Sequence, residues 1–454
     1  MSDGAFARLR ALVSARRARA EGLSSAESAK LRKQLRDCAD GVGGEVSARS
    51  RALQLGHSYQ QLDEHGKRAF LRMIGAEFGP DPRAVADAAA AYQQAQGTPR
   101  QWQAEGALRA AMRSARMRIF THFTALPQGV KFLVDLRADL LRLAGEEPEL
   151  AALDRELEAR LSAWFDVGFL DLQRITWNAP AALLEKLIRY EAVHAIRSWT
   201  DLRNRLDSDR RCYAFFHPRM PQEPLIFVEV ALVNRLADDV QALLDEQAPV
   251  FDATRADHAI FYSISNTQVG LRGVSFGNFL LKRVIDDLQR EFPRLANFAT
   301  LSPLPQLSSW LARAPTELVS AFTDSEWRRL QNAYPALDAA ALAALLRTTE
   351  WTGDTRLARL LRSPLTRLAA RYLMSTRPDG EALDPVARFH LGNGARIERL
   401  NPLADRSPKG LQQSFGMMVN YLYDPAEIEA RVEAYARGNI SATAAVRVAA
   451  KPAR

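Results

Sequence analysis

The sequence predicts an α+β protein, with an all-helical bundle over residues 1–163 followed by a mixed α/β domain over residues 164–454. Three observations predict this class. The N-terminal third repeats apolar residues at intervals of three and four, as amphipathic helices do. Beyond about residue 200, short apolar runs rich in β-branched and aromatic residues indicate strands. Finally, 454 residues that are 47% hydrophobic suffice for two domains with buried cores.

Five segments of the N-terminal region carry the helical pattern, and glycine or proline lies at most of their ends. They are AESAKLRKQLRDCADGV, DPRAVADAAAAYQQAQG, GALRAAMRSARMRIFTHFTAL, GVKFLVDLRADLLRLAG and PELAALDRELEARLSAWFDVGFLDLQRI, beginning at residues 26, 81, 106, 129 and 148. The last segment continues the pattern to Ile175, which places the domain boundary near residue 163. His57, His65 and His122 stand singly here, so no catalytic cluster is expected before the boundary.

The composition argues against several classes of partner. The net charge is +8 and the pI is about 9.6, but only 8 of the 61 basic residues are lysines, and the arginines are scattered among 53 acids. A nucleic-acid surface would gather them into one patch. Cys38 and Cys212 are too few for a disulfide framework or a four-cysteine zinc site. No apolar run approaches the roughly 18 residues of a membrane span. We therefore expect no nucleic-acid, metal or membrane partner.

The elements of the second domain follow one another in an informative order. The run LIFVEVALV at 225–233 and the run HAIFYSISN at 258–266 are predicted strands. A glycine-rich loop follows, and from Asn278 apolar residues recur at helical spacing to Phe292. The next predicted strand, in NFATLSPLPQL at 297–307, contains Ser302. A serine before proline is by itself ordinary turn chemistry.

The loop between the second strand and the helix has glycines at 270, 273 and 277. Such glycines let backbone N–H groups approach a ligand, and a helix N-terminus favours phosphate. The run Gln268-x-Gly270-x-x-Gly273 resembles the pyrophosphate loop of GNAT-type acyltransferases, with one additional residue between its glycines. That resemblance implies coenzyme A on the loop, near the positive charges of Arg272, Lys282 and Arg283. A flexible connection between strand and helix is the alternative.

Three long blocks, read together, carry a more specific resemblance. They are FFHPRMPQEPLIFVEVAL from residue 215, FYSISNTQVGLRGVSFGNFLLKRVIDDLQREFPRLANFATLSPLP from residue 261, and PVARFHLGNGARIERLNPLADRSPKGLQQSFGMMVNYLY from residue 385. In this order they resemble the malonyl-CoA decarboxylase family from about residue 210 to Tyr423. The resemblance implies a GNAT-like catalytic domain after a helical oligomerisation domain.

The family's functional residues can be carried over where the motifs match. Its Leu-Ser-Pro element implies Ser302 as the catalytic serine, its HLxNGA element implies His390 as the catalytic histidine, and the closing NYLY element implies Tyr423 at the site. The implied coenzyme A residues are Gln268, Arg272, Gly273, Val274, Ser275, Phe276, Gly277 and Asn278. Some family members carry glutamate at the position of Ser275, so any role of that acid does not transfer. We expect His217, a turn histidine beside proline, to be structural.

The implied reaction converts malonyl-CoA into acetyl-CoA and CO2. It needs no metal or organic cofactor, because the thioester carbonyl itself accepts the electrons released by the departing CO2. Ser302 and His390 are expected to orient the carboxylate, and His390, assisted by Tyr423, to control protonation. An alternative in which Ser302 is an acylated nucleophile stays open. So do two other functions: a GNAT-type acyltransferase and a non-catalytic acyl-CoA sensor.

The remaining expectations concern assembly and location. The family implies a homotetramer and a place in fatty acid metabolism. The basic run AFARLRALVSARRARA near the start resembles a mitochondrial presequence, although an ordinary first helix or basic tail is the favoured interpretation. The C-terminal AAKPAR is no peroxisomal address. We therefore expect a cytoplasmic enzyme. The tail after Tyr423, which ends in RGNISATAAVRVAAKPAR, is a candidate for disorder.

Overall fold

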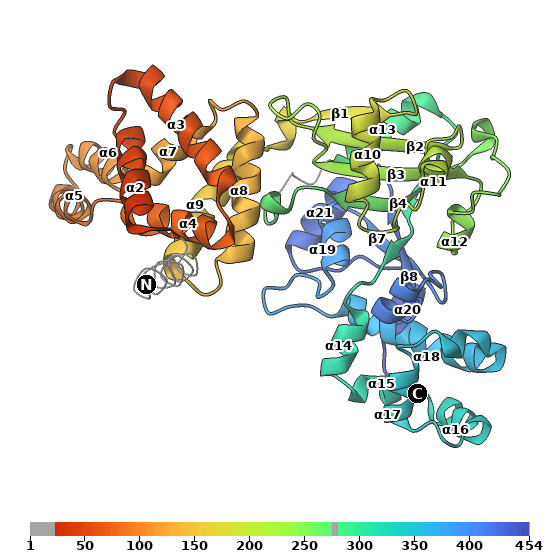
Figure 1. The fold of residues 1–454 in the computed structure, drawn as a ribbon. Coiled ribbons are helices and arrows are strands. Elements are labelled where there is room, and N and C mark those ends of the chain that lie inside the picture. Colours follow the sequence, from red (N-terminus) through yellow and green to blue (C-terminus); the bar gives the residue numbers. More distant parts are fainter. Residues whose placement is uncertain (1–22, 275–279, 454) are drawn as a thin grey trace, which may run out of the picture. The chain divides into compact units, whose positions relative to one another are not determined.

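A computed structural model describes residues 23–274 and 280–453, and these residues form two compact units (Figure 1). The first unit comprises residues 23–170, 217–221 and 268–274, and the second comprises residues 171–216, 222–267 and 280–453. The basic run at residues 5–20 lies outside the described residues.

The first unit is helical. Its helices are α2 (Ser25–Ala39), α3 (Gly44–Gln61), α4 (Glu64–Glu77), α5 (Pro82–Ala95), α6 (Gln101–Ala111), α7 (Ala115–Phe123), α8 (Gly129–Leu143) and α9 (Pro148–Trp164), with a 3-10 turn, η1, at Val167–Phe169. The sequence determines where α2 begins, because Ser24 and Glu27 form a capping box at its N-terminus. The core that these helices share includes Leu35, Phe70 and Leu133. The predicted helical region is therefore confirmed.

Two predicted helices differ in extent. The segment from residue 106 forms two helices, because Ser114 is extended and its hydroxyl donates to Glu156 of α9. The helical pattern from residue 148 ends at Trp164 rather than continuing to Ile175. Residues Asp171–Ile175 form strand β1 instead, paired with β2 along its whole length. Pairing with a neighbouring strand overrides the weak strand preference of Asp, Gln and Arg there.

The second unit is built on a mixed sheet in the order β1-β2-β3-β4-β5-β8-β6, with β7 paired to β8. The strands after β1 are β2 (Arg210–Phe216), β3 (Ile226–Val233), β4 (His258–Asn266), β5 (Asn297–Thr300), β6 (Ser302–Pro303), β7 (Arg396–Asn401) and β8 (Met418–Tyr423). Only β4 and β5 pair in parallel among the described strands, and α13 (Leu280–Glu291) lies between them in sequence. This mixed α/β domain confirms the predicted fold class.

Helices cover both faces of strands β1 to β3 (Figure 1). On one face, α10 (Ala181–Tyr190) and α11 (Trp199–Arg205) bury Leu187 and Leu202 against Ala214 and Phe216 of β2. Because side chains alternate along a strand, Phe215 faces the other side, where Arg283 of α13 lies over its ring.

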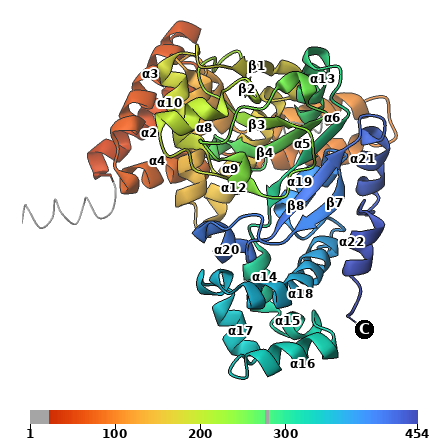
Figure 2. The same ribbon diagram turned by 90° about the vertical axis from the view of Figure 1, so that its right-hand side faces the viewer.

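Among the remaining helices of this unit, α14 to α17 form a separate lobe beyond the sheet (Figure 2). These remaining helices are α14 (Leu307–Arg313), α15 (Thr316–Ser320), α16 (Asp324–Ala333), α17 (Ala339–Leu345) and α18 (Thr355–Met374), followed by α19 (Pro385–Gly392), α20 (Pro408–Ser414), α21 (Ile428–Ala436) and α22 (Ala444–Ala449), with the short α12 at Val240–Leu243. The tail after Tyr423 is ordered as far as residue 453: the Thr443 N–H donates to the Ile397 carbonyl, and α22 packs on α18 and β7. The expectation of disorder is therefore wrong.

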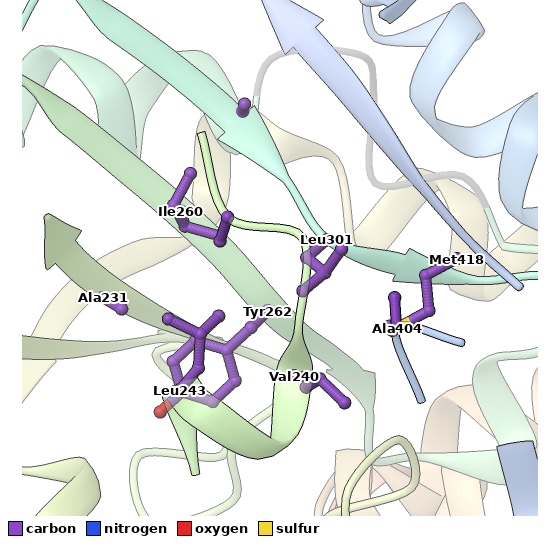
Figure 3. Packing of buried hydrophobic residues seen from close by; sticks show 10 residues of the cluster. Ala231, Val240, Leu243, Ile260, Tyr262, Leu301, Ala404 and Met418 are labelled. Carbon is purple, nitrogen blue, oxygen red and sulfur yellow. The ribbon is translucent and has the colours of Figure 1, made fainter. Parts of the chain in front are cut away.

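One apolar cluster fixes the strand that carries Ser302 (Figure 3). Leu301 is fully buried there with Ile260 and Tyr262 of β4 and Met418 of β8. With Leu301 in this core, the neighbouring Ser302 is presented to the opposite side, because adjacent side chains of an extended chain alternate. In the described part of the chain, no helix is long and apolar enough to cross a membrane.

Candidate active site

The site begins at a short interruption of the sheet. Ala299 pairs with Leu422 and Ser302 pairs with Val419, but the two residues between them are not paired with β8, although Thr300 still pairs with Phe261 of β4. Side chains take over the hydrogen bonds of the interrupted pairing. The Thr300 hydroxyl accepts from the Tyr421 backbone N–H at 3.1 Å, and the Asn420 amide donates to the Thr300 carbonyl at 2.7 Å. Ser302 is therefore held at a defined point beside β8.

Helix α19 delivers His390 to the same point. The helix begins with Pro385, and the Asp384 carboxylate caps it by accepting from the Ala387 N–H at 2.8 Å. The Tyr372 hydroxyl also donates to Asp384, at 2.9 Å. The pKa of Asp384 is raised, mainly because the carboxyl group is buried. These contacts fix the start of an eight-residue helix whose last turn carries His390.

Ser302, His390 and Tyr423 form a continuous hydrogen-bonded chain. The Ser302 Oγ lies 3.1 Å from His390 Nε2, and the Tyr423 hydroxyl lies 2.7 Å from His390 Nδ1. The Ser302 hydroxyl donates to Thr300 Oγ1 at 2.9 Å. Tyr421 stacks on the imidazole with ring centroids 4.4 Å apart and planes 25° apart. The structure thus brings together all three residues that the sequence motifs single out as catalytic.

Burial dominates the electrostatics of this cluster. It lowers the pKa of His390 to about 3, so the imidazole is neutral at ordinary pH. It also raises the pKa of Tyr423 well above its usual value, so the phenol keeps its proton. For both groups, burial is the only cause of the shift that arises within residues 23–274 and 280–453. The site is therefore a neutral environment that contains hydrogen-bond donors.

Only part of the predicted coenzyme A loop lies within the described residues. Gln268 is buried and precedes a 3-10 turn, η3, at Val269–Leu271; Arg272 is exposed, Gly273 has a φ of +86°, and Val274 is buried. Ser275, Phe276, Gly277 and Asn278 lie outside the described residues. Lys282 and Arg283 belong to α13, where Lys282 pairs with Glu429 at 2.9 Å.

Contacts with α8 fix the first part of this loop. Arg137 of α8 donates to the carbonyl oxygens of Gly270 and Arg272 at 2.9 and 2.7 Å, and it pairs with Asp154 and Glu158 of α9. A Cβ at position 270 would overlap the Val134 carbonyl. Gly270 is therefore required by close packing of backbone on backbone, a cause that differs from the ligand approach expected from the sequence.

The other singled-out residues have structural surroundings. His217 Nε2 lies 3.1 Å from the Trp164 carbonyl, its Nδ1 accepts from the Arg219 N–H, and its ring packs on Phe165. Cys38 and Cys212 are buried free thiols. Within residues 23–274 and 280–453, no group of three or more His, Cys, Asp or Glu side chains could hold a metal ion.

Two residues of the site, Thr300 and Tyr421, were not predicted from the sequence. Each lies two positions before a residue that the motifs do identify, Ser302 and Tyr423. Along a strand, positions i and i+2 share a face. The alternation in ATLS and in YLY could therefore have found them.

Known proteins of one family match most of the chain. The family model for the malonyl-CoA decarboxylase C-terminal domain matches residues 168–454, and the model for the N-terminal domain of that family matches residues 78–165. A mitochondrial malonyl-CoA decarboxylase from Rattus norvegicus is 40% identical over 385 residues, which is 80% of this chain and 78% of the relative.

Two solved structures with the same description superpose well. The one from Rhodopseudomonas palustris has a TM-score of 0.84 and 42% identity, and it covers 93% of this chain and 99% of its own. The one from Cupriavidus metallidurans has a TM-score of 0.72 and 46% identity, with the same coverage. The chain is therefore an enzyme of the carboxy-lyase class. It belongs to the malonyl-CoA decarboxylase family.

Proposed function

We propose that the protein converts malonyl-CoA into acetyl-CoA and CO2, with Ser302, His390 and Tyr423 at the reacting centre. One observation carries the assignment of these residues. Three side chains from separate sequence motifs, spread from residue 302 to residue 423, meet in one buried hydrogen-bonded chain. The substrate class comes from the family to which the chain belongs.

The chemistry suits a neutral, buried site. When the bond between the carboxylate carbon and the α-carbon breaks, its electron pair moves into the thioester carbonyl and gives an enolate, and CO2 leaves. Ser302 and His390 hold and orient the carboxylate before this step. The α-carbon then takes one proton, which the His390–Tyr423 pair delivers and solvent replaces. Hydrogen-bond donors aimed at the enolate oxygen lower the barrier.

The loop that begins at Gln268 is proposed to hold the coenzyme A moiety. Arg272 is exposed and positively charged there, and Arg137 anchors its carbonyl to α8. Gly273 and Val274 continue the loop towards Ser275, Phe276, Gly277 and Asn278. Loss of the Arg272 charge should raise the KM for malonyl-CoA and leave kcat unchanged, because the interaction would be made equally in the ground state and the transition state.

A homotetramer is the proposed assembly. The hairpin of α5 and α6 buries none of its own side chains and exposes Trp102 and Met112, which are 75% and 59% accessible. An exposed apolar surface of this kind supports self-association. Light scattering of Trp102→Glu against the parent protein tests it. A cytoplasmic location and a role in fatty acid metabolism stay predictions.

The decisive experiment mixes purified protein with malonyl-CoA without added metal or cofactor and follows acetyl-CoA and CO2 by mass spectrometry. We expect equimolar products from the parent protein and none above background from Ser302→Ala or His390→Ala, with coenzyme A affinity within a few-fold. Binding without turnover would support an acyl-CoA sensor. Acetyl transfer to an added amine would support an acyltransferase. An acyl adduct on Ser302 during turnover would favour the covalent route.

A further inference from the structure

Thr300 is a fully buried residue at the end of β5, and neither the motifs nor the proposed chemistry gives it a role. It lies two positions before Ser302, with Leu301 between them in the apolar core. Its hydroxyl is the acceptor for the Ser302 hydroxyl at 2.9 Å. The Ser302 hydroxyl therefore contacts both Thr300 and His390.

The Thr300 hydroxyl cannot move freely. Residues 300 and 301 lie between the Ala299–Leu422 pair and the Ser302–Val419 pair, where the regular ladder of β8 is interrupted. The Thr300 Oγ1 replaces a backbone acceptor by taking the Tyr421 N–H at 3.1 Å. The break in pairing between residues 300–301 and β8 therefore also fixes the position of the Thr300 hydroxyl.

The number of lone pairs and protons then sets the direction of the hydrogen bonds. A hydroxyl has two acceptor positions and one proton. At Thr300 the two acceptor positions are taken by the Tyr421 N–H and the Ser302 O–H. Because Ser302 has already donated its single proton, its contact with His390 needs a proton on Nε2. The opposite nitrogen, Nδ1, then accepts from the Tyr423 hydroxyl at 2.7 Å.

We infer that Thr300 is a positioning residue that directs the Ser302 proton away from His390 and so keeps the imidazole in its Nε2–H form. In this state His390 donates to Ser302 and is no base for it. Ser302 is therefore not an acyl-accepting nucleophile. Its hydroxyl orients the malonyl carboxylate, which only accepts hydrogen bonds, by turning the same proton from Thr300 Oγ1 to a carboxylate oxygen when the substrate binds. The inference rests on the proposed function for the roles of Ser302 and His390, but the hydrogen-bond direction can be measured without turnover.

The first test measures the tautomer of His390. The full-length protein is labelled with 15N-histidine, and solid-state 15N spectra of the parent, Thr300→Ser and Thr300→Val proteins are compared; His390→Gln identifies the signal. We expect a neutral Nε2–H ring in the parent and in Thr300→Ser, which keeps the hydroxyl. In Thr300→Val the Ser302 proton should turn to Nε2, leaving the ring proton on Nδ1. A parent protein with Nδ1–H overturns the inference, and so does an unchanged tautomer in Thr300→Val.

The second test measures acetyl-CoA formation by the same proteins. Thr300→Val should lower kcat by roughly 10- to 100-fold, as misplaced catalytic groups do, with KM unchanged because Thr300 contacts no substrate in the proposed site. Thr300→Ser should stay within about three-fold of the parent. Asn420→Ala is the structural control, since it removes the side-chain hydrogen bond to the Thr300 carbonyl but leaves the acceptor of Ser302 in place.

An equal loss of kcat and an equal tautomer change in Asn420→Ala would reduce Thr300 to a structural role. Should Thr300→Val fail to fold, the parent spectrum still decides the hydrogen-bond direction, and Thr300→Ala replaces the valine variant. A parent protein that releases no acetyl-CoA yet shows the Nε2–H ring would refute the proposed function and leave this inference standing.

Discussion

The hydrogen bond from Tyr423 to His390 gives the sharpest prediction. Tyr423→Phe removes one oxygen and leaves the ring in place. The lost bond is 2.7 Å long, and both partners are buried, so His390 Nδ1 would lose its donor where water cannot easily replace it. An unsatisfied buried group costs about 1–3 kcal/mol. At about 1.4 kcal/mol for each factor of ten, kcat should fall roughly 5- to 150-fold.

The same strand supplies a matched control. Tyr421 lies two residues earlier on β8 and stacks on the same imidazole, but its buried hydroxyl has no hydrogen-bond partner among the described residues. Tyr421→Phe removes the same atom and keeps the stacking. We expect kcat within about three-fold of the parent protein, and stability unchanged or raised by about 1 kcal/mol, because an unpaired buried hydroxyl is lost.

The kcat and KM of both variants are measured by mass spectrometry of acetyl-CoA under initial-rate conditions, with malonyl-CoA as the varied substrate. The KM should change little in either variant. A kcat of Tyr423→Phe equal to that of the parent protein would refute the assignment of Tyr423 to the reacting centre. Equal losses in the two variants would show that the site needs two hydroxyl groups, and the reasoning from hydrogen-bond partners would fail.

Three further predictions concern stability. Burial lowers the pKa of His390 to about 3, whereas the unfolded value is about 6.5, so the unfolded state takes up the proton first as pH falls. Thermal unfolding should therefore show that the protein loses stability as pH falls from about 6.5 towards 3. The loss should be less steep in His390→Gln, which lacks the titrating imidazole. Gly270→Ala should lower the melting temperature and weaken coenzyme A binding, whereas Gly106→Ala, whose Cβ meets nothing within 4 Å, should do neither. Leu301→Ala should cost about 2–5 kcal/mol in urea unfolding, and a smaller loss would contradict its place in the core.

Local patterns predicted much of the fold. The strands β3 and β4 follow the sequence because their apolar runs are dense, and α13 does because its apolar residues recur at helical spacing. The lobe from α14 to α17 received no prediction, since its helices have only five to ten residues. Helix α18 contains Pro364, which normally ends a helix. Strand β1 depends on pairing with β2, and such long-range contacts leave no local signal.

The identity of the site residues was predictable where a sequence motif contains them. Ser302, His390 and Tyr423 follow from Leu-Ser-Pro, HLGNGA and NYLY, but the 3.1 Å between Ser302 and His390 depends on the pairing of β6 with β8 and on the capping of α19. The alternation in ATLS places Thr300 on the face of Ser302, but its role was not predictable, because that role depends on an interruption in the pairing with β8. No composition or spacing encodes such an interruption directly.

The electrostatics of the site favour decarboxylation over acyl transfer. An acyltransferase that uses an amine acceptor needs a general base with a pKa near the working pH. Burial holds the pKa of His390 at about 3, so its imidazole takes up protons poorly. No charged group among the described residues contributes to the shift of His390 or Tyr423. In such surroundings a malonyl carboxylate is the localised charge, and loss of CO2 spreads that charge over an enolate. A neutral site therefore opposes base catalysis and assists the departure of CO2.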